Sequence, residues 1–117
     1  MLPKINRLCK KKEIDGVFLR GKSVKEGFLV LKTAKSRLET VRFCFVVSKR
    51  VSKTAVGRNL IKRRMREIAR AALPLLKPGH DLIFIAMPGL EKMDYPRIEK
   101  DMKKSFARSG IIMSDKL

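Results

Sequence analysis

The sequence predicts a single α+β domain in the order helix, two or three strands, helix, strand, helix. A chain of 117 residues has room for one domain with a modest core. Its hydrophobic fraction of 44% is too high for a disordered basic chain. Runs with helical periodicity alternate with short β-rich runs, and no repeat or low-complexity linker interrupts them. We assign residues 1–113 to the domain and residues 114–117 to a frayed tail.

The first predicted helix covers residues 10–20, where Ile14, Val17 and Phe18 follow one another at the spacing of one helical face. Gly16 inside this segment costs about 1 kcal/mol relative to Ala, and no good N-cap residue precedes it. This helix is therefore expected to depend on tertiary packing.

Three β-rich segments are expected to form strands. Residues 27–33 carry apolar side chains on both faces, and residues 41–48 alternate, so that Phe43 and Phe45 share one face with a core. Residues 48–54 form a basic connector with room for a short further strand. Residues 82–87 are an apolar run that predicts a central strand.

Two further helices are expected. The long one runs from Ala55 to Leu73, because Pro74 prevents its continuation without a kink. Five of its residues fill an apolar arc of about 100° that can pack on a core: Ile61, Met65, Ile68, Ala69 and Ala72. In the last helix Asp94 is the expected N-cap and Gly110 the expected terminator.

A basic face on the long helix is the main functional signal. From Thr40 to Arg66 the chain has 27 residues without an acidic side chain, and nine of them are Lys or Arg. One arc of about 140° forms what we call the basic ridge: Arg58, Asn59, Lys62, Arg63, Arg66 and Arg70. Solvated helices usually mix both signs of charge. A single-sign face on a chain of net charge +18 predicts a phosphate backbone as partner.

The sequence offers no protein-borne active site or metal site. No Ser-His-Asp set, phosphate-binding glycine loop or metal-ligand cluster occurs. His80, the only histidine, follows a Pro-Gly turn and is expected to be a turn residue. Cys9 and Cys44 are too few and too far apart for a zinc site and are expected to be reduced thiols. No apolar stretch is long enough to span a bilayer or to act as a signal peptide, so a cytoplasmic location is expected.

The motif around the basic ridge resembles the signature of the bacterial ribonuclease P protein subunit family. The likeness rests on residues 47–51 and 55–67, and on the opening stretch from Asn6 through residues 21–23. Across about residues 4–108 the order and length agree. The ridge residues Arg58, Asn59, Lys62, Arg63 and Arg66 stand at the family spacing. Two positions depart from the family pattern, namely Leu60, where a third basic residue is common, and Ile14, where an aromatic is usual.

The resemblance implies a compact α+β sandwich of the αβββαβα type, similar to a domain of a small-subunit ribosomal protein, with a left-handed βαβ crossover through the long helix. It implies a monomeric protein that assists a catalytic RNA in cutting the 5′ leader from precursor tRNA. The RNA would carry the catalysis with Mg²⁺ bound mainly by the RNA and substrate. Because the sequence predicts no catalytic or metal-binding residue, the protein alone is expected to be inactive.

The resemblance also implies two binding surfaces. Contacts to the catalytic RNA are expected from Arg58, Asn59, Lys62, Arg63, Arg66, Lys49, Arg50 and Lys53. The single-stranded leader is expected in a cleft between the first helix and the sheet, lined by Phe18, Ile14 and Leu31. Phe18 has an alternative role as a buried core residue.

Other functions are compatible with the composition. A structural RNA-binding protein of ribosomal type would have the same electrostatics and no substrate of its own. A DNA-binding helix-turn-helix needs a helix directly before the recognition helix, where this sequence predicts a strand. A membrane-surface helix would expose bulky apolar residues beside its charges, whereas the apolar arc here is needed for a core.

Overall fold

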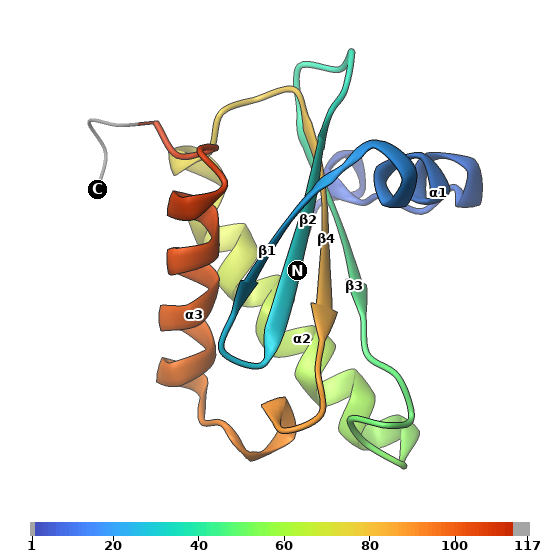
Figure 1. Ribbon diagram of the computed structural model, residues 1–117, viewed down its shortest axis with the longest axis vertical. Coiled ribbons are helices and arrows are strands. Elements are labelled where there is room, and N and C mark those ends of the chain that lie inside the picture. Colours follow the sequence, from blue (N-terminus) through green and yellow to red (C-terminus); the bar gives the residue numbers. More distant parts are fainter. Residues whose placement is uncertain (1, 114–117) are drawn as a thin grey trace.

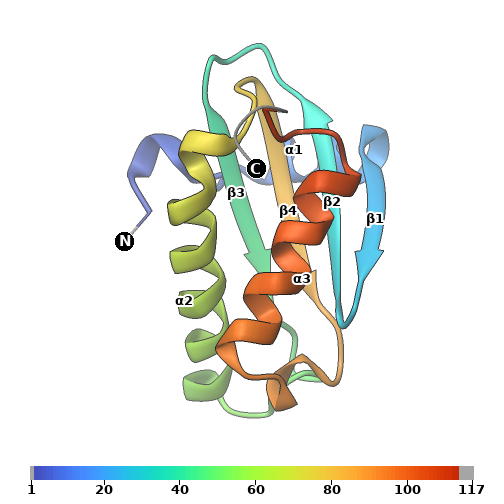
Figure 2. The same cartoon turned by 90° about the vertical axis from the view of Figure 1, so that its left-hand side faces the viewer.

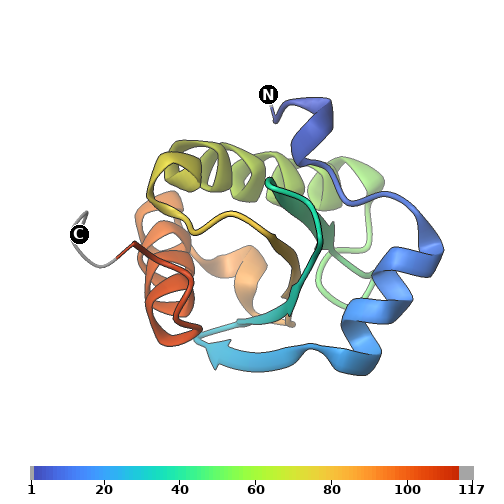
Figure 3. The same ribbon diagram turned by 90° about the horizontal axis from the view of Figure 1, so that it is seen from above.

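The computed structural model describes residues 2–113, which form a single α+β domain of three layers (Figures 1 and 3). The elements, in chain order, are η1 (Lys4–Asn6), α1 (Lys11–Arg20), β1 (Lys22–Glu26), β2 (Leu29–Lys35), β3 (Val41–Val46), α2 (Ala55–Ala72), η2 (Leu73–Leu75), β4 (His80–Ala86), η3 (Leu90–Lys92) and α3 (Tyr95–Arg108). Helices α2 and α3 cover one face of the sheet, and α1 lies on the other (Figures 1 and 2).

The four strands form one sheet in the order β1-β2-β4-β3. Neighbours β1–β2 and β2–β4 are antiparallel, whereas β3 and β4 are parallel and are joined by α2. In Figure 1 both parallel strands run downward, α2 returns behind the sheet, and β4 lies to the left of β3. This connection is a left-handed crossover, as the family resemblance implied and against the general preference for the right-handed form.

The main core lies between the sheet and the two long helices. The sheet contributes alternate side chains, because successive residues of a strand point to opposite faces. The five residues of the predicted apolar arc of α2 are all buried there, which confirms that prediction. Phe106 of α3 packs edge-on against Phe43 and Phe84, at centroid distances of 6.4 and 5.4 Å. Phe45 stacks on both sheet aromatics and is half-buried.

A smaller core lies beneath α1. Its fully enclosed members are Leu8, Val17 and Ile83, and Ile14 packs against them while partly buried. Val17 is the only buried residue of α1. No side-chain hydrogen bond caps the N-terminus of this helix, in agreement with the sequence prediction. The helix is therefore held by little apolar surface.

The strand pattern differs from the prediction in two places. Strand β1 (Lys22–Glu26) was not predicted, because its sequence is polar and its side chains are exposed or half-buried. Pairing with β2 forms it. The further strand considered within residues 48–54 is absent, since Val51 N donates to Ser48 O at 3.1 Å in a turn. The tail predicted at residues 114–117 lies outside the described residues.

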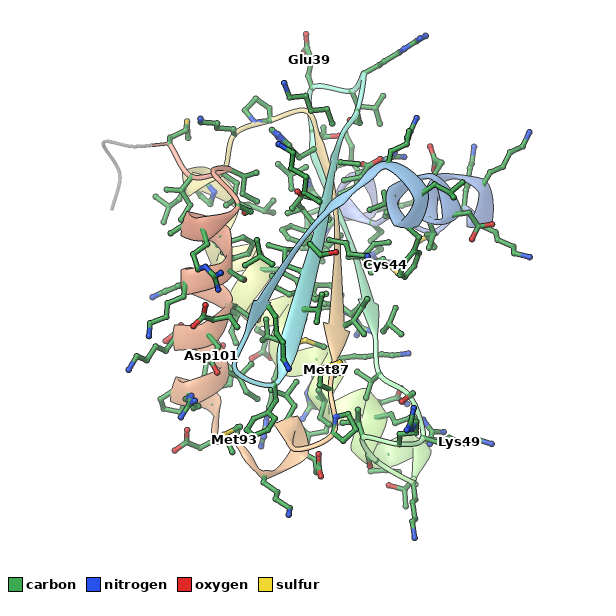
Figure 4. The ribbon with its side chains drawn as sticks, viewed as in Figure 1. Glu39, Cys44, Lys49, Met87, Met93 and Asp101 are labelled. Atoms are coloured by element: carbon green, nitrogen blue, oxygen red, sulfur yellow. The ribbon has the colours of Figure 1, made fainter. Side chains whose placement is uncertain are left out.

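Single residues determine the local structure at the start of α3 and in the β1–β2 hairpin. Asp94 caps α3, as predicted, because its Oδ1 accepts from Arg97 N at 3.0 Å. Gly27 in the hairpin has φ +58°, and a Cβ there would lie 2.3 Å from the Asp101 carboxylate. Asp101 is buried and is held by Arg97 Nε at 3.1 Å (Figure 4). A side chain at position 27 would therefore be strained and would collide with this carboxylate.

Candidate nucleic-acid interface

The basic ridge occupies the solvent-facing side of α2. Asn59, Arg63, Arg66 and Arg70 are exposed, while the opposite side of the helix is buried in the main core. None of the ridge residues forms an ion pair with an acidic side chain of residues 2–113. A helix anchored in this way holds the backbone positions of several unpaired cations on one face, and such a face can neutralise the charges of a phosphate backbone.

The first turn of α2 shows why Thr54, Gly57 and Arg58 follow one another in the motif. Thr54 is the N-cap, and its Oγ1 accepts from Gly57 N at 3.0 Å. A Cβ at Gly57 would lie 2.2 Å from Ser52 Oγ, so only glycine allows this approach. Arg58 Nη1 donates to the carbonyls of Ser52 and Lys53, both at 3.0 Å. Arg58 therefore braces the preceding loop with one nitrogen and retains its other donors for a ligand.

The loop before α2 carries the three remaining predicted cations. Val47 and Val51 are buried and anchor it, while Lys49, Arg50 and Lys53 are exposed. Figure 4 shows Lys49 at the end of the molecule where α2 begins. The loop and the ridge thus form one basic surface, consistent with their predicted common partner.

The structure places the three predicted leader residues in different environments around α1. Phe18 is 42% exposed, which excludes the alternative of a buried core residue. Lys32 Nζ lies 5.5 Å from its ring centroid and also donates to Ser23 Oγ at 2.9 Å. Ile14 is half-buried and packs against the smaller core. An exposed ring can stack on a base, and a lysine beside it can bind the phosphate of the same nucleotide.

The assignment of Leu31 to the leader surface is wrong. Leu31 is 0% exposed and belongs to the main core under α2 and α3. Alternation along β2 turns Val30 and Lys32 toward the α1 side instead, and both are half-buried. We therefore define the leader surface as Ile14, Phe18, Val30 and Lys32. The sequence could not show which side of β2 faces α1, because apolar residues occupy both sides.

The ridge and the α1 side of the sheet meet at the edge strand β3. Cys44, which packs against the smaller core, and Lys62 and Arg66 of the ridge line one depression of about 180 Å³. Burial raises the pKa of the Cys44 thiol, the neighbouring Cys9 adds to this effect, and Lys62 opposes it. Cys9 is exposed and Cys44 half-buried (Figure 4), and both are free thiols.

An ion triad that sequence reasoning missed fastens α1 to the sheet. Arg42 of β3 donates to Asp81 through Nε and Nη2, both at 2.8 Å, and through Nη1 to Glu13 of α1 at 2.9 Å. The hydrogen bond to Asp81 raises the pKa of Arg42 above its ordinary value, although burial of the guanidinium acts in the opposite direction. The three residues are far apart in the chain, so only the fold brings them together.

The described residues offer neither a metal cluster nor a membrane span. No group of three His, Cys, Asp or Glu side chains that could hold an ion occurs within residues 2–113. His80 is engaged in its own turn, with Nδ1 at 3.1 Å from Pro78 O and 3.2 Å from Lys77 O. Within the same residues no helix combines the length and the hydropathy needed to cross a bilayer.

Comparison with known proteins gives a consistent result. The family model described as Ribonuclease P matches residues 2–110. A Clostridium botulinum (strain 657) protein named Ribonuclease P protein component is 38% identical over 109 residues, which cover 92% of this chain and 97% of the relative. A Cyanothece protein of the same name is 32% identical over 128 residues, covering 96% and 98%.

Among solved structures, a mutant of the Staphylococcus aureus RNase P protein superposes with a TM-score of 0.87. It is 24% identical and covers 93% of this chain and 92% of its own, a likeness of fold. The fold, the helix motif and the relatives agree, and the chain belongs to the ribonuclease P protein family.

Proposed function

We propose that this chain binds the catalytic RNA of ribonuclease P through the basic ridge and its preceding loop, and the 5′ leader of precursor tRNA on the leader surface. In this way it assists endonucleolytic removal of the leader, which leaves the mature tRNA 5′ end. The protein acts as a monomer within a ribonucleoprotein, and the expected compartment is the cytoplasm. Family membership and the single-sign face of α2 support this proposal.

The basic ridge is the main observation that supports the proposal. Its cations stand on a helix whose apolar arc is buried in the main core, so the backbone positions that carry them are fixed before an RNA arrives. Each phosphate contact releases condensed counterions, which makes affinity strongly salt-dependent. Asn59 adds two donors and one acceptor that a purely cationic face lacks, and it can therefore contact sugar or base edges as well as phosphates.

The leader surface suits a single strand. Phe18 offers a π-face on which any base can stack, and Lys32 places an ammonium beside it. Stacking tolerates every base, so the same surface can accept leaders of different sequence. The chain thereby lengthens the interface between enzyme and substrate without reading a fixed sequence.

The proposal assigns the chemistry to RNA. Mg²⁺ prefers octahedral oxygen ligands and is usually held by phosphates with one or two carboxylates. We therefore place the ion mainly on the RNA and substrate, as the family resemblance implies. When bound there, Mg²⁺ supplies charge neutralisation at the scissile phosphate. The protein's part is to bind and orient the leader.

A double variant of the ridge tests the function. Arg63→Ala with Arg66→Ala should lower the affinity for the catalytic RNA and reduce the log–log salt slope by about one to two units. Lys100→Ala with Lys104→Ala, on the exposed side of α3, removes the same charge and serves as control. An equal loss of RNA affinity in both variants would show that the ridge contributes only nonspecific electrostatic attraction.

Reconstitution tests the division of labour. RNA-free protein should not cleave precursor tRNA, and protein with the catalytic RNA should release the leader. Cleavage by the RNA-free protein would overturn the assignment of catalysis to RNA. Recovery of ribosomal RNA instead of one catalytic transcript from the native host would favour the ribosomal alternative.

A further inference from the structure

A second basic concavity lies at the end of the sheet where β2 ends and β4 begins. Its volume is about 730 Å³, and Arg20, Lys22, Lys35 and Lys77 line it together with His80. These side chains come from α1, β1, β2 and the segment before β4, and the end of α3 completes the wall. Figure 3 looks onto this end of the molecule. We call the four cations, with this concavity, the end pocket.

The four cations of the end pocket have no acidic partners. No Asp or Glu lines the pocket, and none of the four forms an ion pair within residues 2–113. Arg20 and Lys35 also line an adjoining depression with Glu13 and Asp81, but both of these carboxylates are paired with Arg42. Like charges held around one concavity repel one another, and an anion in the pocket would relieve this repulsion.

Helix dipoles offset only part of the positive charge in the end pocket. The C-terminal ends of α1 and α3 both reach the pocket. Each helix C-terminus carries roughly half a negative charge, so the two together offset about one of the four cations. Lys22, Lys35 and Lys77 lie outside helices altogether. A positive surplus remains even when the net charge of −1 on Arg42, Glu13 and Asp81 is included, and it favours binding of phosphates.

The end pocket is distinct from the two surfaces already described. Alternation along the β1–β2 pair places Lys22 and Lys35 on the side of Leu31 and Thr33, which faces α2 and α3, whereas Val30 and Lys32 of the leader surface face α1. Lys22 and Lys35 are therefore separated by the sheet from the leader residues of β2. The ridge begins at the opposite end of the molecule, where β3 and β4 end (Figure 1).

We propose that the end pocket is a second contact for the catalytic RNA, in which Lys22, Lys35 and Lys77 bind phosphates of a backbone segment other than the one on the ridge. The inference rests on the proposed function, because that function supplies the RNA. An extended RNA can contact both ends of a domain whose dimensions are 36 × 32 × 25 Å, whereas the leader surface includes Val30 and Lys32 on the other face of β2 from Lys35. Two separated contacts would also fix the orientation of the protein on the RNA.

The test is a charge-matched pair of triple variants. Lys22→Gln, Lys35→Gln and Lys77→Gln remove the three exposed lysines of the pocket. Lys92→Gln, Lys100→Gln and Lys104→Gln remove three exposed lysines before and along α3 and give the same net charge. Binding of the catalytic RNA is measured for each protein across a salt series, with thermal unfolding as a check of folding. The affinity of the assembled enzyme for precursor tRNA forms a second arm.

The pocket variant should lower the log–log salt slope for the catalytic RNA by about two to three units, while the control changes it by less than one. Its affinity for precursor tRNA, once assembled, should match that of the wild type. Equal slopes for the two variants would overturn the inference, as would a loss confined to precursor tRNA. The Arg63/Arg66 ridge variant separates the two proposals: if the ridge alone matters, only the end pocket fails, and if neither matters, the proposed function fails.

Discussion

Helices α2 and α1 carry the two proposed RNA surfaces, and they are held to the same sheet in opposite ways. Helix α2 buries five side chains in the main core and begins with a satisfied N-cap. Helix α1 buries only Val17, lacks a side-chain cap, and depends on the ion triad through Glu13. The comparison indicates that α2 holds the ridge firmly, whereas α1 is the less stable of the two helices. A single-stranded leader, which has no fixed shape, suits the adaptable surface.

The largest expected difference between the helices concerns their cores. Met65→Ala in α2 removes a fully buried side chain and should lower the free energy of unfolding by about 2–5 kcal/mol. Val17→Ala in α1 removes less volume and should cost about 1–3 kcal/mol. Denaturant unfolding of both variants measures the two values. A larger loss for Val17→Ala would refute the ranking of the helices.

The ion triad should affect α1 selectively. Asp81→Asn places an amide against two donors of Arg42 and should cost about 1–3 kcal/mol. Because Arg42 also holds Glu13, hydrogen exchange should accelerate in α1 and much less in α2. Asp15→Asn, at an exposed position on α1, is the control. Equal acceleration in both helices would show that the triad stabilises the whole domain and not this attachment.

Phe18→Ala should impair substrate binding rather than folding. Loss of one base stack costs about 1–3 kcal/mol, which corresponds to about a 5- to 140-fold weaker affinity for precursor tRNA with a long leader. Leu19→Ala, at a neighbouring residue that is 86% exposed, serves as the matched control. Binding of the catalytic RNA should be unchanged in both variants. Wild-type affinity for long and short leaders in Phe18→Ala would remove this ring from the leader surface.

The smallest effect is expected at Cys44, where α1 and α2 both approach the sheet edge. Burial raises the pKa of its thiol, so the folded protein holds this proton more tightly than the unfolded chain. Its contribution to stability is therefore complete below the ordinary thiol pKa of about 8.5 and declines as the pH rises through the raised value. Unfolding of wild type and Cys44→Ala at pH 7 and pH 10 isolates the contribution. A difference between the two proteins that does not change with pH would contradict it.

Local patterns determined much of this protein. The buried arc of α2, the ridge on its other side and the cap of α3 are consequences of residue spacing within single helices, where the period of 3.6 residues relates sequence directly to a face. The exposed phosphate-binding candidates could be named from the sequence for the same reason. Their partner entered through resemblance of the motif and not through periodicity.

Tertiary structure decided what depends on contacts between distant segments. Strand β1 exists because β2 pairs with it, and Leu31 faces the main core because of the side on which α2 and α3 pack. The Arg42 triad and the end pocket join residues from three or more elements. The left-handed crossover likewise follows from how whole layers pack. A one-dimensional pattern encodes which side chains are apolar, but the free energy that selects their neighbours arises only when the layers assemble.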